Sequence, residues 1–302
     1  MNVQVIAVDG KMPNLALMKI AAWHKSKGDT VGFNISDPDK VYISTIFDWN
    51  GSQSYGIPKL FNCTVEIGGS GVDIQKDLPG DIEHIMPDYS LYDIDYSMGF
   101  TSRGCPNNCP FCIVPIKEGA ITDHAYITEF LHPDHNKVIL LDNNFLASPR
   151  WRGNLNYIIE HDIMVNFCQG NDIRRINEDN AKLLSETKFS NYKFNRKQMH
   201  FAWDIPEIEK SVERGINIFN DAGVKPYNLM FYVLCGFNTS FEQDMYRVMR
   251  LREWGCDPFV MVYNNRRDDK RLRDFARWVN RKEIFKSCTF DEYNSKEVVN
   301  VS

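Results

Sequence analysis

The sequence predicts an α/β protein: an incomplete (β/α)6 TIM-like barrel preceded by a small α/β layer. From residue 96 onward, apolar runs alternate with helical stretches, a pattern typical of parallel strands joined by right-handed crossovers. Before residue 70 the order is instead strand, helix, strand, strand. We therefore expect two domains, residues 1–95 and residues 96–302, and a chain of 302 residues is long enough for both.

The N-terminal domain begins with a layer over residues 1–70. Its strands are expected at three apolar runs, residues 3–8, 41–47 and 64–69. A helix should begin at Pro13 and end at Gly28, because proline suits the first turn and glycine the end of a helix. Residues 71–95 are rich in Asp, Pro and Gly, and we expect them to link the layer to the barrel.

The predicted barrel contains six strand–helix units. The strands are expected at residues 96–101, 137–142, 163–168, 199–203, 228–234 and 258–263. The helices are expected at residues 123–131, 150–160, 177–187, 206–222, 240–254 and 269–285. In barrels of this kind the reactive groups follow the carboxyl ends of the strands. The residues just after each strand are therefore the first candidates for a functional site.

The average composition narrows the classes of function. The net charge is −5, whereas a protein that clamps a nucleic-acid backbone over a wide area is usually basic. No apolar run reaches the length of a membrane span, and the N-terminal residues lack the pattern of a secretory signal. We therefore expect a cytoplasmic protein. The locally basic tail over residues 266–286 leaves a nucleotide or RNA substrate as the less favoured alternative to a solvated helix face.

Three cysteines lie together directly after the first barrel strand. Cys105, Cys109 and Cys112 have the spacing C-x3-C-x2-C within the segment MGFTSRGCPNNCPFCIVP. Three thiolates on one loop can hold three irons of a 4Fe-4S cluster and leave the fourth iron open, as a catalytic cluster requires. The alternative is structural zinc, which prefers four ligands, commonly in two separated pairs. The remaining cysteines are scattered singly, so no second pair is present.

The cysteine segment resembles the radical S-adenosylmethionine superfamily. Phe111 stands just before the third cysteine, as in that superfamily, and Arg103-Gly104 with the run CIVP is similar to its methylthiotransferase and cobalamin-binding-domain branches. The resemblance implies that the three cysteines ligate a catalytic cluster and that S-adenosylmethionine chelates the open iron. It further implies cleavage of this cofactor to a 5′-deoxyadenosyl radical, hydrogen abstraction from a substrate, and a low-potential electron donor such as flavodoxin or ferredoxin.

The resemblance also implies where S-adenosylmethionine binds. After the second barrel strand the family commonly has a Gly-Gly-Glu-type stretch, and Asp142, Asn143 and Asn144 stand there with acceptor oxygens for the methionine amino group. A simple Asn-rich turn is the alternative. After the third strand, Arg174 is a candidate partner of the methionine carboxylate, with a surface arginine as the equal alternative. Gln169, at the end of the same strand, is expected to face the barrel interior.

Further candidates follow the later strands. Asp204 stands after the fourth strand, either as a partner of ribose hydroxyls or substrate or as the cap of the next helix. Gly236 ends the fifth strand, where a glycine lets the backbone approach the purine closely. Cys168 and Cys235 also stand at strand ends. Free cysteine is usually a small buried hydrophobe, and a hydrogen donor or a second cluster ligand is the minority interpretation.

Residues 1–70 resemble a trimmed Rossmann-like cobalamin-binding domain. Gly68-Gly69 is similar to the glycine pair that lets the nucleotide tail of cobalamin pass. The Asp-x-His-x-x-Gly pattern of that family has no counterpart after VDGKMPN, and Cys63 is alone where a methylthiotransferase has three cysteines. We therefore favour a packing domain over a cobalamin site or a second cluster.

The function predicted from the sequence is that of a radical enzyme that abstracts hydrogen from an unidentified substrate. Three alternatives stay open. They are a non-enzymatic iron-sulfur redox or sensor protein, a zinc-stabilised binding module, and a radical methyltransferase acting on a nucleotide or RNA. Methyl transfer, sulfur insertion and rearrangement are not distinguished by the sequence.

Overall fold

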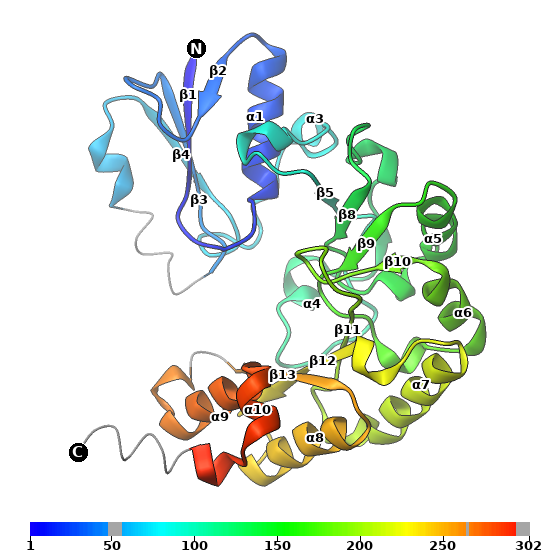
Figure 1. Cartoon of the computed structure of the whole chain (residues 1–302). Helices are drawn as coiled ribbons and strands as arrows, with labels where there is room; N and C mark the ends of the chain where they lie inside the picture. The colour runs from blue at the N-terminus through cyan, green and yellow to red at the C-terminus, as the bar shows by residue number, and fades with distance from the viewer. Residues whose placement is uncertain (48–55, 264–265, 294–302) are drawn as a thin grey trace. The chain divides into compact units, whose positions relative to one another are not determined.

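The computed structural model describes residues 1–47, 56–263 and 266–293, and they form an α/β protein whose main sheets consist of parallel strands (Figure 1). The α/β class predicted from the sequence is confirmed. Within these residues, no helix is long and apolar enough to cross a membrane.

The chain divides into two compact units. The first consists of residues 1–101 with 124–139, and the second of residues 102–123 with 140–302. In chain order, the elements up to the start of the second unit's main part are β1 (Asn2–Ala7), α1 (Leu15–Ser26), β2 (Thr30–Gly32), β3 (Lys40–Ser44), η2 (Ile57–Leu60), β4 (Thr64–Gly68), α3 (Gly80–Glu83), η3 (Tyr89–Leu91), β5 (Ser97–Gly99), β6 (Ser102–Arg103), α4 (Val114–Lys117), β7 (Thr122–Asp123), η4 (Ile127–Glu129) and β8 (Lys137–Leu140).

Four parallel strands form the core of the first unit, in the order β2-β1-β3-β4. Val3 and Val5 of β1 are fully buried, and α1 packs along the sheet (Figure 1). Asn14 caps α1, because its Oδ1 accepts from the Leu17 amide at 3.1 Å. The helix therefore begins close to the predicted Pro13. The sequence patterns missed β2, since its three residues, TVG, are too few to show an alternation.

Residues 71–95 are more than a link between two domains. They include α3 and η3, and the side chains of Ile82 and Tyr89 are buried. The Tyr89 hydroxyl donates to the carbonyl oxygen of Phe130 and accepts from the Met98 amide at 3.1 Å. Burial raises the pKa of Tyr89 to about 12, so the phenol stays a neutral donor at ordinary pH. The segment is therefore packed into the first unit.

At residues 123–131 the structure has only a strand end and the single 3-10 turn η4, so the helix predicted there is wrong. Glu129 closes the turn, because its carboxylate accepts from the Tyr126 amide at 2.7 Å. Pro133 follows four residues later, and helical backbone is disfavoured just before a proline. The Glu129 carboxylate thus caps the start of the turn, and Pro133 limits how far the turn can continue as a helix.

The remaining elements belong to the second unit. They are η5 (Phe145–Ala147), α5 (Trp151–Glu160), β9 (Met164–Phe167), η6 (Ile173–Arg175), α6 (Glu178–Glu186), β10 (Lys188–Phe189), β11 (Met199–Ala202), η7 (Pro206–Ile208), α7 (Glu209–Asp221), η8 (Pro226–Asn228), β12 (Leu229–Cys235), α8 (Phe241–Glu253), β13 (Asp257–Val262), η9 (Arg266–Asp268), α9 (Lys270–Asn280) and α10 (Lys282–Ser287).

The strands predicted after residue 95 are present as β5, β8, β9, β11, β12 and β13. One sheet has the order β10-β9-β8-β5, and another has the parallel order β11-β12-β13. A parallel bridge joins Asn171, just after β9, to Phe201 in β11. The short strand β10 and the antiparallel pair of β6 with β7 were not predicted.

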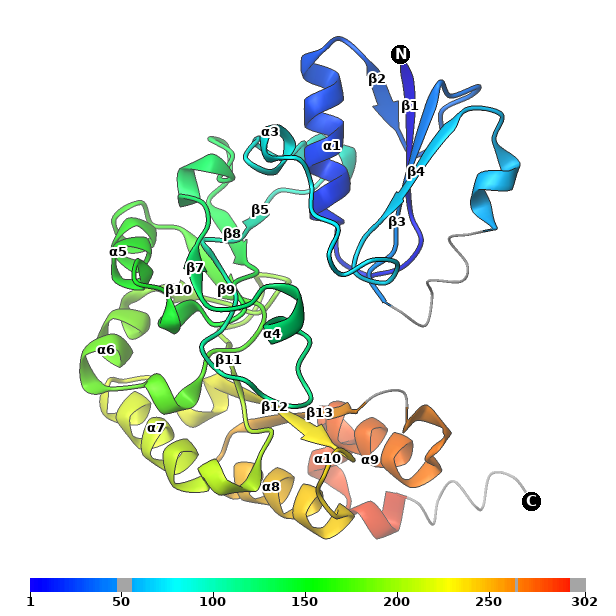
Figure 2. The same ribbon diagram turned by 180° about the vertical axis from the view of Figure 1, so that it is seen from behind.

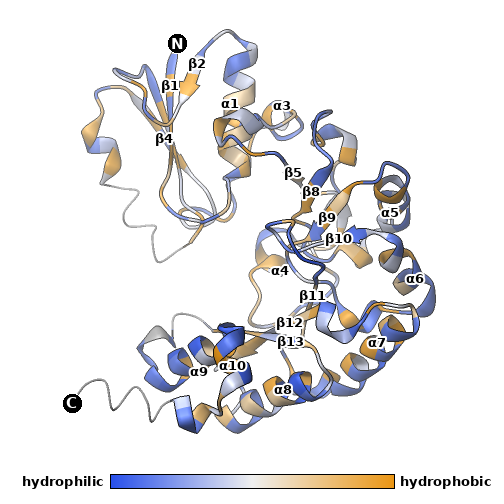
Figure 3. Cartoon of the chain, in the orientation of Figure 1, coloured by the Kyte–Doolittle hydropathy of each residue, from blue (hydrophilic) through white to orange (hydrophobic). Residues whose placement is uncertain are grey.

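Helices cover one face of the sheet β11-β12-β13. Phe201, Phe231 and Val260 point to this face and are almost fully buried, and α7, α8 and α9 lie over it (Figure 2). Figure 3 shows both polar and apolar residues along α7 and α8, as expected for helices with one buried face. At the edge strand β13, Asn280 donates to the Val260 carbonyl at 3.0 Å and accepts from its amide at 2.8 Å. This protects part of the free edge.

Candidate functional site at the cysteine loop

The three clustered cysteines lie on the loop between β6 and α4 in the second unit. The Cys105 amide donates to the Gly119 carbonyl at 3.2 Å, and the Cys112 amide donates to the Cys109 carbonyl at 3.0 Å. All three thiols are free of disulfides and half-buried. The backbone thus folds the loop back on itself and leaves the sulfurs partly accessible.

Gly104 determines how the chain enters this loop. Its φ is +82°, and a Cβ at this position would stand 2.2 Å from the Ala120 carbonyl oxygen. Its amide also donates to Oδ1 of Asn143 at 2.9 Å. Because only glycine adopts this conformation at so close an approach without strain, the residue before the first cysteine is constrained by backbone geometry.

The thiols of the loop influence one another electrostatically. Burial raises the pKa of Cys109 and of Cys112, and the neighbouring thiols act in the same direction. The positive charge of Arg174 opposes this effect at Cys109. The two thiols are therefore harder to ionise than an ordinary cysteine, and added positive charge, such as that of a metal ion, would oppose this effect.

Metal binding can be assessed only for the side chains that the structure describes. Among them, no group of three or more His, Cys, Asp or Glu side chains is gathered closely enough to hold a metal ion. Ligation of a cluster by Cys105, Cys109 and Cys112 therefore stays a prediction, as does the zinc alternative.

The stretch after β8 is hydrogen-bonded to the start of the cysteine loop. Asp142 is buried, and its carboxylate accepts from both the amide and the hydroxyl of Ser102 at 2.6 Å. The side-chain amide of Asn144 donates to the Cys105 sulfur at 3.4 Å. Together with Asn143, these residues hold the loop in place. Their predicted contact with a methionine amino group stays a prediction.

Asn144 provides the observation that bears most directly on a cofactor. Its Oδ1 is buried and has no hydrogen-bond partner within the described ranges. A buried acceptor without a partner is unfavourable, and an ammonium group would satisfy it. Hydrogen bonds to the cysteine sulfurs are also among the features that tune iron-sulfur clusters. The soft donor set and this acceptor fit the predicted cluster and its amino-group ligand.

Arg174 is held beside the cysteine loop by Asp172. Its guanidinium donates two hydrogen bonds to the Asp172 carboxylate, at 2.7 and 2.8 Å, and the Asn107 amide donates to the same carboxylate at 2.9 Å. Burial opposes ionisation of Asp172, but these hydrogen bonds outweigh it and keep its pKa low. The arrangement fastens η6 to the cysteine loop. The Arg174 guanidinium is paired with Asp172 of the same chain. Its binding to the methionine carboxylate stays a prediction.

Asp204 lies close to Arg174 and to the thiols of the cysteine loop. Its Oδ1 accepts from the Leu234 amide at 3.1 Å, whereas the residue that precedes η7 as its cap is Ile205. Burial raises the pKa of Asp204 to about 6, and its charge influences the thiols of Cys109 and Cys112. The capping role considered from the sequence is therefore not the one observed, and Asp204 bridges the ends of two strands near the cysteines.

Phe111 packs against Phe237, the residue that follows Gly236 in the chain. Phe111 packs edge-on against Phe237 with the ring centroids 5.6 Å apart, and Phe237 packs against Tyr263 at 4.7 Å. Gly236 has a φ of +79°, and a Cβ there would stand 2.6 Å from a side-chain carbon of Leu272. Glycine is therefore required here by the chain's own packing. Purine binding at this position stays a prediction.

The sequence analysis missed the buried ion pair of Asp244 and Arg247 in α8. The carboxylate accepts from the Gly236 amide at 3.0 Å, and the guanidinium donates to the carbonyls of Trp203 and Leu234, both at 2.7 Å. The pair thus holds the carboxyl ends of β11 and β12, where the candidate residues stand. Its only signal in the sequence is an acid and a base three residues apart, a pattern that more often marks a solvated helix face.

The remaining predicted residues of the second unit are Gln169, Cys168 and Cys235. Gln169 is exposed. Burial raises the pKa of Cys168 to about 11. Cys235 is fully buried, with its sulfur near the Val233 carbonyl, and burial raises its pKa strongly. Both thiols therefore behave as small apolar groups in this structure.

In the first unit, Gly69 serves the packing of the chain itself. Its φ is +96°, and a Cβ would stand 2.3 Å from the Thr45 carbonyl oxygen. Cys63 is half-buried and free. The close backbone approach accounts for the glycine by the packing of the chain, and both the packing role and the cobalamin site stay predictions.

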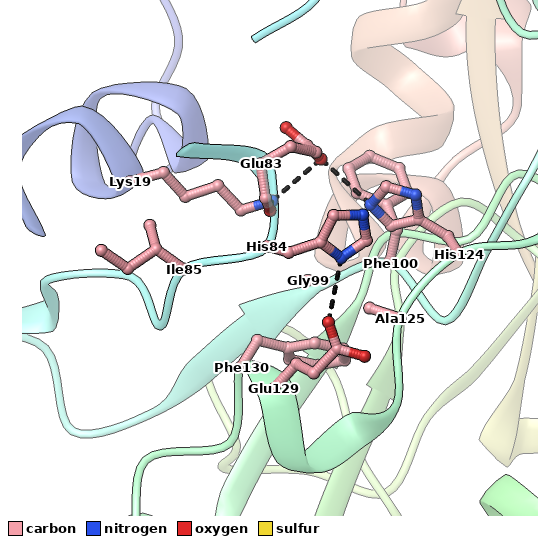
Figure 4. Close-up of a pocket in the computed structure, with 10 residues that line it drawn as sticks. All are labelled: Lys19, Glu83, His84, Ile85, Gly99, Phe100, His124, Ala125, Glu129 and Phe130. Atoms are coloured by element: carbon pink, nitrogen blue, oxygen red, sulfur yellow. Dashed lines mark hydrogen bonds and ion pairs between the residues drawn. The ribbon is translucent and has the colours of Figure 1, made fainter. Parts of the chain in front are cut away.

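A second polar cluster lies within the first unit and was not predicted (Figure 4). Nζ of Lys19, which is 7% exposed, contacts the Glu83 carboxylate at 2.9 Å. The same carboxylate contacts the His124 ring at 3.0 Å, and His84 contacts Glu129 at 2.9 Å. These contacts tie the segment around His124 to α1 and α3.

The fold and the site together define an α/β protein with a cysteine loop at the edge of parallel strands. The sequence matches no protein-family model, and comparison with curated proteins finds no match.

Proposed function

We propose that the protein is a radical S-adenosylmethionine enzyme that abstracts hydrogen from an as yet unidentified substrate. The observation that carries the proposal is the convergence of three segments on the cysteine loop. Asn144 bonds to Cys105, and Asp172 accepts a hydrogen bond from Asn107 of the loop. Arg174, held by Asp172, and Asp204 both lie within electrostatic range of the Cys109 thiol. These residues follow three different strands, as in α/β enzymes that build their sites at carboxyl strand ends.

The proposed arrangement of strands is the incomplete barrel. In support, β5, β8 and β9 are neighbours in one sheet, β11, β12 and β13 in another, and the Asn171–Phe201 bridge links β9 to β11. The strands thus follow one another in chain order, which is the order of a (β/α) barrel. In such a barrel the cysteine loop, Asn144, Asp204 and Gly236 would all stand at one rim.

In the proposed site, Cys105, Cys109 and Cys112 hold a 4Fe-4S cluster. When bound, the cluster would supply one-electron reduction of the sulfonium of S-adenosylmethionine, with the electron coming from a low-potential donor protein, to give methionine and a 5′-deoxyadenosyl radical. The protein's own residues bind and orient. Asn144 offers its unsatisfied oxygen to the methionine amino group, and Asp142 fixes the loop through Ser102. We place this chemistry in the cytoplasm, where thiols stay reduced.

Anaerobic reconstitution of the full chain tests the proposal. We expect about four irons per chain and release of 5′-deoxyadenosine that requires both reductant and S-adenosylmethionine. Alanine substitution of Cys105, Cys109 or Cys112 should abolish both. Cys63→Ala and Cys288→Ala are matched controls, because these thiols are also free and half-buried but lie outside the loop. They should retain both properties.

The same experiment separates the alternatives. A brown protein that never cleaves S-adenosylmethionine would identify an iron-sulfur redox or sensor protein. A colourless protein that takes up zinc would identify a metal-stabilised binding module. Either result contradicts the proposed function.

A further inference from the structure

Basic side chains gather at the amino end of the sheet β11-β12-β13. The three strands are parallel neighbours, and their register pairs Met199 with Leu229 and Met230 with Asp257. The residues that lead into β11 and β12 and the first residue of β13 therefore lie side by side at one edge of the sheet. This edge is the opposite one from the carboxyl ends, where the candidate site stands.

Asp257 brings a further segment to this edge. It is paired with Lys282 of α10, and its carboxylate lies 3.6 Å from the Arg196 guanidinium. Lys286 stands one helical turn after Lys282. Burial lowers the pKa of Lys282, and the positive charges of Arg196 and Lys286 act in the same direction. Three cations are thus close enough to repel one another.

Other lysines of this edge add to the positive charge. Residues 188–198, which lead into β11, contain four basic residues and no acidic residue. Within the described parts of the chain, several exposed lysines here have no carboxylate at ion-pair distance. They are Lys193, Lys197, Lys225 and Lys286. We call these four lysines, together with Arg196 and Lys282, the basic edge. Because the whole chain has a net charge of −5, this excess is local, and it favours a partner of negative charge.

Exposed aromatic rings stand among these cations. Tyr192 is 54% exposed, and Nζ of Lys193 lies 5.6 Å from the centroid of its ring. Tyr192 belongs to a turn in which the Asn191 amide donates to the Arg196 carbonyl at 3.0 Å. Tyr227, which leads into β12, is 66% exposed. Cations interspersed with exposed rings are typical of surfaces that bind single-stranded nucleic acid, where phosphates meet the charges and bases stack on the rings.

We propose that the basic edge binds single-stranded nucleic acid, with phosphates on its lysines and Arg196 and bases stacked on Tyr192 and Tyr227. An acidic protein offers negative charge without flat rings to stack. In a duplex the bases already stack on one another. The exposed rings therefore favour a single strand over either. The inference does not depend on the proposed function, because it involves neither the cysteine loop nor the carboxyl ends of the strands.

Three anionic probes of similar length test the inference. They are a thymidine oligomer of about 20 nucleotides, which exceeds a typical single-strand site, an abasic oligomer with the same phosphates, and polyglutamate. Each is fluorescently labelled and titrated with the full chain, and fluorescence anisotropy is followed over a range of salt concentrations. We expect the thymidine oligomer to bind at least about fivefold more tightly than the abasic one, the effect of stacking one base. Equal binding of the three probes, or no binding of the thymidine oligomer, would overturn the inference.

Charge variants locate the binding. Lys197→Gln and Lys286→Gln each remove an exposed charge without breaking a described ion pair, so folding should be unaffected. Each should weaken binding and reduce the slope of log affinity against log salt by about 0.7, the loss of one phosphate contact on a single strand. Lys210→Gln is the matched control, because Lys210 is also exposed but stands at the start of α7, which follows the carboxyl end of β11. If all three changes weaken binding alike, the binding is not at the basic edge.

A ring variant separates stacking from charge. Tyr192→Ala should weaken binding of the thymidine oligomer about fivefold and leave binding of the abasic oligomer unchanged. Tyr246→Ala is the control, because Tyr246 lies in α8 and is similarly exposed, at 52%, and it should bind both oligomers as the wild type does. A Tyr192→Ala protein that loses affinity for both oligomers equally would contradict base stacking and with it the inference.

The experiment needs neither iron nor reductant, so it can fail separately from the proposed function. Oligomer binding without cleavage of S-adenosylmethionine would support the basic edge and contradict the radical chemistry. Cleavage without oligomer binding would do the reverse.

Discussion

Arg247 and Asp244 form an ion pair whose side chains are 0% and 1% exposed, with nitrogen and oxygen 2.5 Å apart. The guanidinium also donates to the Trp203 carbonyl, just after β11, and to the Leu234 carbonyl, near the end of β12. A buried charge that loses its partner is strongly destabilising, because neither water nor another charge replaces it. The pair therefore holds the rim on which the candidate site depends.

We predict that Asp244→Ala lowers the free energy of unfolding by about 3–5 kcal/mol, measured by urea denaturation. Replacing both partners, as in Asp244→Leu with Arg247→Met, should cost less than the single change, because no buried charge is left unpaired. Arg250→Ala is the control on the same helix. Its carboxylate partners Glu209, Glu213 and Glu253 are 32%, 48% and 61% exposed, so water can replace the lost contacts and the loss should stay well below that of Asp244→Ala. A single variant as stable as the control would show that the pair is unimportant.

The second prediction compares Gly104, at the start of the cysteine loop, with Gly119, which follows α4 and accepts from the Cys105 amide. Both Gly104 and Gly119 have positive φ, +82° and +71°, but only at Gly104 does an added Cβ meet backbone, whereas at Gly119 nothing lies within 4 Å. Gly119→Ala should therefore cost only conformational strain, about 1 kcal/mol. Gly104→Ala should cost more and reduce iron uptake on reconstitution. Iron content and thermal unfolding are the measurements, and equal effects of the two changes would contradict this account of the loop.

The third prediction concerns Asp204, whose pKa burial raises to about 6 from a usual value of 3.8. For an acid with a raised pKa, the folded state binds the proton more tightly than the unfolded state. Tighter proton binding therefore stabilises the folded state below about pH 4, and this stabilisation is lost as pH rises through about 6. Asp204→Asn should therefore match the wild type near pH 4 and exceed it by about 2 kcal/mol at pH 7.5.

Urea denaturation of iron-free protein across this pH range measures the effect. The exposed Asp221→Asn substitution is the control for removal of a carboxylate. If the difference between Asp204→Asn and the wild type does not grow with pH, the carboxyl group is not desolvated as the structure indicates.

The fourth prediction concerns Lys19 and Glu83 in the first unit, a contact with both side chains largely buried, 7% and 15% exposed. Glu83→Gln removes the negative charge that both the Lys19 ammonium and the His124 ring contact. We expect a loss of about 2–4 kcal/mol and faster amide hydrogen exchange over residues 124–131. Lys137→Met, whose partner Asp95 is 77% exposed, is the control and should change exchange there little. Unaltered exchange in Glu83→Gln would show that the cluster does not hold the segment.

Much of the fold was predictable because its signals are local. The strands β8, β9, β11 and β12 are apolar runs, and strand formation responds to side-chain type within a few residues. Helix ends followed local chemistry as well, as at Ser240, whose hydroxyl accepts from the Gln243 amide. The failures were equally local in cause: β2 is too short to show a pattern, and η4 stops after one turn at Glu129.

The candidate site was predictable in part. The spacing of Cys105, Cys109 and Cys112 is a property of the chain, and so is the recurrence of polar residues after strands. The sequence does not show which of those residues contact the cysteine loop. Contacts such as Asn144 to Cys105 and Asn107 to Asp172 join positions 39 and 65 residues apart.

The sequence by itself determined the order of the longer strands and of most helices, and the presence of three closely spaced thiols, because periodicity and spacing act over a few residues. Only the tertiary structure decided that Asp244 and Arg247 are buried, that Asp204 bonds to Leu234, and that Arg196 and Lys282 meet at Asp257. Burial depends on which surfaces pack together. That choice is made by contacts between segments distant in the chain, and it sets the hydration on which charge and hydrogen-bond energies depend.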